Sequence, residues 1–278
     1  MISFLHTYQP QAILVSFGPI TIYWYGLFVV AGISAALAVT LWLAKRHGLT
    51  GNIIFDLAFW LIINGIIGAR LYDDLLQLPY YIEHPGQILK IWEGGLAIHG
   101  AIIAGLTTVW FFAKKRKISF WQLTAVITPG LALGQAIGRW GNYFNQEIFG
   151  LPTTLPWGIP IALLNRPSQY ITSSYFQPTF LYESLGCLLI SFILLAYNIY
   201  IFKKGRTKTH SYIWVVALYM ILYSILRFNL EFIRLDETPA WFGLRAPQII
   251  SLIIIIAACL LLFLNHHARQ ARQEKNLS

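Results

Sequence analysis

The sequence contains few charged residues. Only 11% of its 278 residues are Asp, Glu, Lys or Arg, whereas 57% are hydrophobic and the mean hydropathy is +0.60. Soluble domains carry about 25% charged residues, and a chain with so few could not cover a water-exposed surface. The composition therefore excludes an ordinary soluble protein and favours one that crosses a membrane several times.

Cysteine is also scarce, with two residues in the whole chain. Cys187 and Cys259 lie in separate apolar runs, so we expect neither a disulfide framework nor a metal site. The first 17 residues also lack the basic segment and the small-residue cleavage site of a signal peptide. We therefore expect no cleaved leader there.

Apolar runs of about 20 residues, the length that spans a bilayer, occur seven times. We predict membrane spans near residues 18–44, 52–76, 95–113, 119–138, 179–202, 211–232 and 246–264. The expected fold class is an all-α polytopic membrane protein, a bundle of about seven transmembrane helices. We expect residues 1–278 to form a single integral-membrane domain.

Positive charge is concentrated in the connections on one side of this predicted bundle. If the spans alternate, segments 45–48, 114–117, 203–208 and 266–275 share that side and hold 13 of the 20 Lys and Arg residues. The positive-inside rule then places the N-terminus outside and the basic tail, residues 265–278, in the cytoplasm. The same bias explains the net charge of +9, so we expect no nucleic-acid partner.

The predicted outward side carries the longer connections. Residues 77–95 contain two prolines and an apolar-basic stretch that suits the membrane interface. Residues 139–178 contain spaced prolines, which argue against a helix. We predict a small irregular or β-containing extracytoplasmic lobe there.

Ionisable side chains near the membrane core are costly, so each one is a candidate site residue. In the sixth predicted span, Tyr223, Arg227 and Glu231 are spaced four residues apart and share one helical face. An Arg–Glu pair that only packs the bundle would explain the last two equally. His99 is either a packing residue or a proton-transfer group. Tyr25 has the ordinary alternative of an interfacial aromatic residue.

The stretch GRWGNYFNQEIFG, which begins at Gly138, follows the fourth predicted span. That span and the sixth both run outward, so we expect Arg139, Asn142 and Glu147 at the depth of the sixth span's polar face. Arg139 and Arg227 suit a phosphodiester head group, because guanidinium binds phosphate bidentately and stays charged. Glu147 and the glutamate of the sixth span would orient the two arginines.

Several motifs together resemble those of the bacterial prolipoprotein diacylglyceryl transferase family. The matching stretches run in family order along essentially the whole chain: WYG at 24–26, GARL at 68–71, GGLAIHG at 94–100, LGQAIGR leading into GRWGNYFNQEIFG, LYE at 181–183, YSILRFNLEFIR at 223–234 and PQIIS at 247–251. Ala101 stands where the family often has a second glycine. Gln177 stands where it often has a histidine, which leaves His99 as the candidate base.

The resemblance implies an enzyme of the bacterial plasma membrane. It would transfer the diacylglyceryl group of phosphatidylglycerol to the thiol of the lipobox cysteine in a preprolipoprotein signal peptide, releasing glycerol phosphate. No metal and no organic cofactor is implied. The implied catalytic residues are His99, Arg139, Arg227, Tyr25 and Tyr223. The implied substrate-binding residues are Arg139, Asn142, Glu147, Gly150, Arg227 and Glu231.

Two other functional classes are left open by the sequence. A secondary transporter or lipid flippase favours inverted repeats and sites at the membrane midplane, whereas no repeat is evident and the polar motifs lie toward one face. The third predicted span begins on the outer side, so His99 is expected at the same depth as Arg139 and Glu231. A noncatalytic assembly or scaffold protein explains the hydrophobicity but not this convergence of Arg, Glu and His residues. The transferase is the interpretation that the motifs favour.

Overall fold

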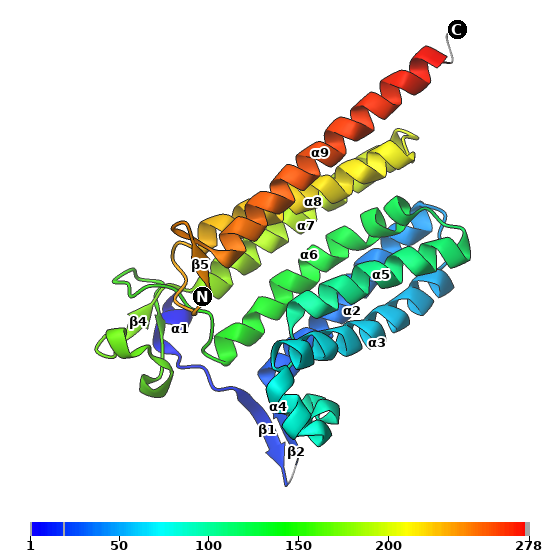
Figure 1. The fold of residues 1–278 in the computed structure, drawn as a ribbon. Helices are drawn as coiled ribbons and strands as arrows, with labels where there is room; N and C mark the ends of the chain where they lie inside the picture. Colours follow the sequence, from blue (N-terminus) through cyan, green and yellow to red (C-terminus); the bar gives the residue numbers. More distant parts are fainter. Residues whose placement is uncertain (1, 19, 276–278) are drawn as a thin grey trace. The chain divides into compact units, whose positions relative to one another are not determined.

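The computed structural model describes residues 2–18 and 20–275, and most of them are helical (Figure 1). Within that part of the chain, five helices are long and apolar enough to cross a membrane. They are α2 (Trp24–Arg46), α3 (Gly51–Leu76), α7 (Thr179–Lys203), α8 (Thr209–Leu230) and α9 (Ala246–Lys275). The prediction of a mostly helical membrane protein is confirmed to this extent.

Two further long helices coincide with the third and fourth predicted spans. They are α5 (Ile98–Arg116), whose last turn carries three basic residues, and α6 (Phe120–Phe144), which contains Pro129. Neither is among the five helices that combine the length and the apolar character of a membrane span. The number of seven spans therefore stays a prediction.

The first predicted span begins at Gly18, whereas helix α2 begins at Trp24. The residues before the helix, Ile20–Tyr23, form strand β2, which pairs antiparallel with β1, Ile13–Phe17. Isoleucine and threonine are β-branched and favour extended backbone. This apolar run therefore contains part of a short hairpin as well as a helix.

Helix α6 continues past Gly138, the predicted end of the fourth span, to Phe144. Arg139 and Asn142 consequently lie in the last turns of this helix and not in the lobe, which begins only after it. Helix α9 runs to Lys275, so the expected basic tail from residue 265 is helical in its described part. Residues 276–278 of that tail lie outside the described residues.

The chain divides into two compact units. Unit 1 comprises Met1–Val39 and Ile127–Ser278, and unit 2 comprises Thr40–Val126. In unit 1, helix α8 packs against both α7 and α9, and Figure 1 shows the three helices running alongside one another. The expectation of one integral-membrane domain stays a prediction.

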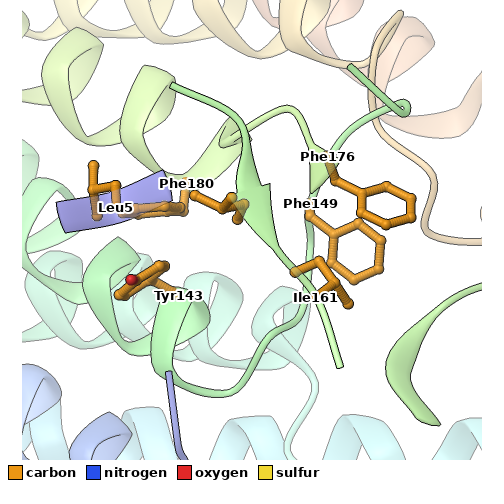
Figure 2. Close-up of a cluster of buried hydrophobic side chains, with 7 residues drawn as sticks. Leu5, Tyr143, Phe149, Ile161, Phe176 and Phe180 are labelled. Atoms are coloured by element: carbon orange, nitrogen blue, oxygen red, sulfur yellow. The ribbon is translucent and has the colours of Figure 1, made fainter. Parts of the chain in front are cut away.

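A small lobe, residues 145–178, joins α6 to α7 within unit 1. It contains the antiparallel strands β3 (Ile159–Pro160) and β4 (Tyr175–Phe176) and two single turns of 3-10 helix. Buried apolar side chains attach it to the short helix α1 (Ile2–Thr7) and to the adjoining ends of α6 and α7 (Figure 2). The cluster consists of Leu5, Tyr143, Phe149, Ile159, Ile161, Phe176 and Phe180.

Helices α6 and α7 are joined inside unit 1 by buried hydroxyl groups. Ser184 Oγ donates a hydrogen bond to the carbonyl oxygen of Ala136 at 2.7 Å, and Ser191 Oγ donates one to that of Pro129 at 2.8 Å. Interhelical bonds of this kind stabilise helix pairs in apolar surroundings. They fix α6 against the helix that carries Glu183.

In unit 2, helices α3 and α5 approach each other closely at two glycines. A Cβ atom added to Gly68 would lie 2.7 Å from the carbonyl oxygen of Gly100, and one added to Gly100 would lie 2.7 Å from the carbonyl carbon of Gly68. Asn64 Nδ2 donates to Thr108 Oγ1 at 2.9 Å further along the same pair. Small residues permit this backbone approach, as is common between membrane helices.

We expect Gly100→Ala to destabilise unit 2, because the new methyl group would overlap the backbone of α3. Overpacking of this kind costs about 1–3 kcal/mol. The apparent melting temperature of the detergent-solubilised protein measures the effect.

Gly105→Ala is the matched control on the same helix, since its Cβ would meet only Leu61 Cδ2 at 3.8 Å. Alanine is the better helix former by about 1 kcal/mol, so this variant should melt at or above the wild-type temperature. Equal melting temperatures for the two variants would contradict the proposed close approach at Gly100.

Candidate active site

Glu183, on helix α7, is the carboxylate at which three helices of unit 1 meet. Arg139 of α6 places Nη2 2.8 Å from Glu183 Oε1, and the hydroxyl of Tyr223 on α8 donates to the same oxygen at 3.1 Å. Arg234, just beyond the end of α8, places Nη1 3.8 Å from Glu183 Oε2. The acid therefore holds two guanidinium groups and a phenol in fixed positions.

The second branch from Arg139 passes through Asn142. Arg139 Nη1 donates to Asn142 Oδ1 at 3.2 Å, and Asn142 Nδ2 donates to Glu147 Oε1 at 2.6 Å. Glu147 lies between Gln146 and Ile148, both of which have positive φ angles (51° and 55°). This irregular turn directs Glu147 to the asparagine, so Glu147 reaches Arg139 only indirectly.

Glu147 was expected to orient the arginines, but the carboxylate that contacts Arg139 directly is Glu183. The expected pairing of Arg227 with Glu231 is present, with Nη2 2.8 Å from Oε2. Glu231 is fully buried and also lies 3.2 Å from Nε of Arg245 and 4.0 Å from Nε of Arg234.

Arg234 links the two carboxylate centres, because it approaches both Glu183 and Glu231. Its Nε also donates to Asp236 Oδ1 at 2.7 Å. Burial alone would raise the pKa of Asp236. The hydrogen bond from Arg234 and the nearby guanidinium charges outweigh that effect and hold the pKa below its ordinary value. This carboxylate therefore remains ionised and fixes Arg234.

The connection between α8 and α9 is held in place by Arg245. This connection contains a hairpin of β5 (Ala240–Trp241) and β6 (Leu244–Arg245). Arg245 donates to the carbonyl oxygens of Glu231 at 3.1 Å, Arg234 at 2.8 Å and Asp236. One side chain consequently fixes the backbone from Glu231 to Asp236, which includes Arg234.

The arginines and the acids differ in their access to solvent. The side chains of Arg139 and Arg227 are 24% and 17% exposed, whereas those of Glu183 and Glu231 are 2% and 0% exposed. Among the described residues, Arg139 Nε and Arg227 Nη1 have no hydrogen-bond acceptor. Buried donors of this kind favour an oxygen-rich anion as a ligand. The site therefore presents partly open cations that are held from behind by buried acids.

Tyr25 and Gly150 lie against the same group of elements. A Cβ atom on Gly141 would be 2.7 Å from Tyr25 Cδ2, so the tyrosine ring packs directly on the end of α6. Gly150 forms an antiparallel bridge with Arg234, and a Cβ atom there would be 2.8 Å from the carbonyl oxygen of Ile233. Glycine at position 150 thus lets the lobe backbone lie beside the residue that links the two acids.

His99 belongs to unit 2, where it is the second residue of α5 and is exposed. Its ring centroid lies 5.9 Å from that of Tyr72. Arg70 fixes the segment before it, donating to the carbonyl oxygens of Ile88 at 2.9 Å and Gly94 at 2.9 Å. The role of His99 as a base stays a prediction.

Tyr25, Arg139, Asn142, Glu147, Gly150, Tyr223, Arg227 and Glu231 all lie in unit 1. Three residues of the site were not expected there from the sequence: Glu183, Arg234 and Arg245. A signal for Glu183 was present, because a single carboxylate in the apolar sequence of α7 is itself unusual. The contacts of Arg245 depend on the fold of the hairpin and had no comparable signal.

The chain is similar in sequence to a known protein family. Residues 12–264 match the family model described as prolipoprotein diacylglyceryl transferase. Proteins named phosphatidylglycerol–prolipoprotein diacylglyceryl transferase include one from Synechococcus elongatus, 44% identical over 89% of this chain and 84% of the relative. One from Gloeobacter violaceus is 39% identical over 96% of each chain.

A third relative with the same name, from a Nostoc species, is 42% identical over 90% of this chain and 87% of its own length. The family match covers the candidate spans except the C-terminal end of α9, and it includes every residue of the site described above. The chain belongs to the prolipoprotein diacylglyceryl transferase family.

Proposed function

We propose that the protein transfers the sn-1,2-diacylglyceryl group of phosphatidylglycerol to the lipobox cysteine of preprolipoproteins, the first step of bacterial lipoprotein maturation. Family membership supports this reaction, as do the names of the relatives. The observation that carries it is the pair of partly open arginines, Arg139 and Arg227, each held by a buried carboxylate. Such a pair suits the phosphodiester of the lipid.

In this reaction the cysteine sulfur of the acceptor attacks the glyceryl carbon that carries the phosphate. A carbon–sulfur bond forms, the carbon–oxygen bond to phosphate breaks, and glycerol phosphate leaves with the bonding electrons. Negative charge grows on the leaving phosphate, and fixed cations at that position stabilise the transition state. Arg139 and Arg227 perform this role in our proposal.

The remaining residues position these two arginines and the lipid head group. Glu183 and Glu231 fix the guanidinium groups, and Glu147 acts on Arg139 through Asn142. Asn142 and Tyr25 would add hydrogen bonds to the glycerol or phosphate oxygens. Tyr223 of α8 donates a hydrogen bond to Glu183 and so helps to fix this acid.

The acceptor must lose its thiol proton before or during the attack. A free cysteine has a pKa of about 8.5, so a base near the thiol would increase the thiolate fraction at neutral pH. We assign this role to His99. The proton would pass from the thiol sulfur to the imidazole, while the phosphate leaves as an anion.

We further propose that the chain crosses the bacterial plasma membrane seven times, with its N-terminus outside and its C-terminus in the cytoplasm. The two additional long helices and the basic segments on one side support this topology. The site then faces the extracytoplasmic leaflet. Phosphatidylglycerol can enter laterally, with its acyl chains still in the bilayer, and the signal peptide arrives from the same membrane.

Replacing either phosphate-binding arginine should sharply reduce transfer. We expect Arg139→Ala and Arg227→Ala each to lower kcat by about 100- to 1,000-fold, the usual effect of removing one transition-state donor. The assay follows labelled diacylglyceryl transfer from phosphatidylglycerol to a lipobox peptide. Arg116→Ala, which removes an exposed pair with Asp56, is the control. Near-normal turnover by both site variants would exclude the proposed binding of the phosphate by Arg139 and Arg227.

Glu183→Gln should weaken the site because it removes the charge that holds Arg139 and Arg234 while keeping the size of the side chain. We expect kcat/KM to fall at least about 10-fold, since charged hydrogen bonds contribute about 1.5–3 kcal/mol.

Glu237→Gln, at an exposed position, should leave turnover unchanged. Glu183→Asp keeps the charge and should retain more activity than Glu183→Gln. A positioning role predicts this order when folded protein is compared at equal concentration. Equal activity of Glu183→Gln and wild type would show that Arg139 does not depend on this acid.

His99→Gln should lower kcat by about 100-fold at neutral pH, as is typical for loss of a general base. The defect should diminish as the pH rises past the thiol pKa of about 8.5, because the acceptor then ionises without help. The measurement is a pH–rate profile with the lipobox peptide. Full activity of His99→Gln at pH 7 would exclude His99 as the base, without contradicting phosphate binding by Arg139 and Arg227.

A further inference from the structure

A basic hollow in unit 1 lies between the C-terminal end of α7, the N-terminal end of α8 and Arg269 of α9. Its volume is about 330 Å³. Arg206 and Lys208 come from the α7–α8 connection, His210 from the start of α8, and Arg269 from α9. Tyr200 also contributes to the wall.

The cations of this hollow differ from those of the active site. None of the residues that line it is acidic, and within the described residues Arg206, Lys208 and Arg269 form no ion pair. Arg206 Nη1 instead donates to the hydroxyl of Tyr200 at 3.2 Å. The described lining of the hollow therefore carries net positive charge, which an anion of matching size would neutralise.

The first turn of α8 adds to this positive potential. It contains His210 and no acidic residue, and the N-terminal end of a helix carries a partial positive charge. Asn265 Nδ2 of α9 donates to the carbonyl oxygen of His210 at 3.2 Å. This bond joins α9 to the start of α8, so two walls of the hollow are fixed to each other.

The lining of the hollow is aromatic and apolar as well as basic. Tyr200 and Trp214 are both exposed, and Ile201 forms a buried part of the wall. Tyrosine and tryptophan are enriched where a membrane protein meets the lipid head groups. Basic pockets between membrane helices are also suited to lipid head groups.

The hollow is separate from the active site. Helix α7 carries Glu183 near its first turn and Tyr200 near its last. At 1.5 Å per residue the two positions are about 25 Å apart along the helix, close to the thickness of the hydrocarbon core. A ligand in the hollow therefore cannot be the lipid that reacts at Arg139.

We propose that the hollow binds the head group of an anionic phospholipid from the leaflet opposite the active site. The guanidinium groups of Arg206 and Arg269 bind the phosphate oxygens, and Lys208 adds a third charge. The acyl chains lie along the apolar surface below Trp214. With the proposed orientation this is the cytoplasmic leaflet, and the bound lipid joins the ends of α7, α8 and α9.

The test uses full-length protein in detergent, delipidated and titrated with phosphatidylserine during native mass spectrometry. We compare wild type with R206Q/K208Q/R269Q. The matched control, K115Q/K203Q/K204Q, removes the same number of charges from exposed positions outside the hollow. We expect the affinity for the most tightly bound lipid to fall about 10- to 100-fold in the first variant. In the second variant this affinity should stay at the wild-type value.

Other outcomes would overturn the proposal. Equal weakening in both triple variants would indicate diffuse surface charge, and equal binding of phosphatidylcholine would indicate a purely apolar groove. Displacement of the lipid by inorganic phosphate alone would indicate a site for the free ion. Loss of the lipid in Arg139→Ala would place it in the active site. Transferase activity of the hollow variant, measured separately, should stay near normal, so this proposal and the proposed reaction can fail independently.

Discussion

The central constraint in unit 1 is the burial of two carboxylates, Glu183 and Glu231. A buried charge is costly unless cations and hydrogen bonds compensate it, and here arginines from several elements do so. The acids bring the ends of α6, α7 and α8 together and hold Arg139 and Arg227 in fixed positions. Because the acids are less exposed than these arginines, an anion approaching the site meets positive charge first.

The lobe and the hairpin stabilise this arrangement from outside the helices. Gly150 brings the lobe backbone against Arg234, and Arg245 binds three carbonyl groups around the end of α8. Arg234 in turn contacts both carboxylates. Elements distant in sequence therefore fix the same few side chains, which is the preorganisation that electrostatic stabilisation of a leaving phosphate requires.

The long helices, the polar stretch after Gly138 and the face shared by Arg227 and Glu231 could be predicted from the sequence, because apolar length and helical periodicity are local properties of the chain. Glu147, close to Arg139 in the sequence, was expected to orient the arginines, whereas the direct partner of Arg139 is Glu183 on another helix. Spacing along the chain cannot reveal a pairing that depends on how two helices pack. The late start of α2 and the turn around Glu147 likewise depend on local backbone that hydrophobicity does not describe.

In the proposed reaction, Arg139 and Arg227 together bind the phosphate of the lipid substrate. The most direct measurement is an experimental structure of the protein with phosphatidylglycerol bound. We predict phosphate oxygens about 2.7–2.9 Å from guanidinium nitrogens of both arginines, as in charge-assisted hydrogen bonds, with Glu183 and Glu231 still behind them. A productively bound lipid whose phosphate contacts neither arginine would contradict the account.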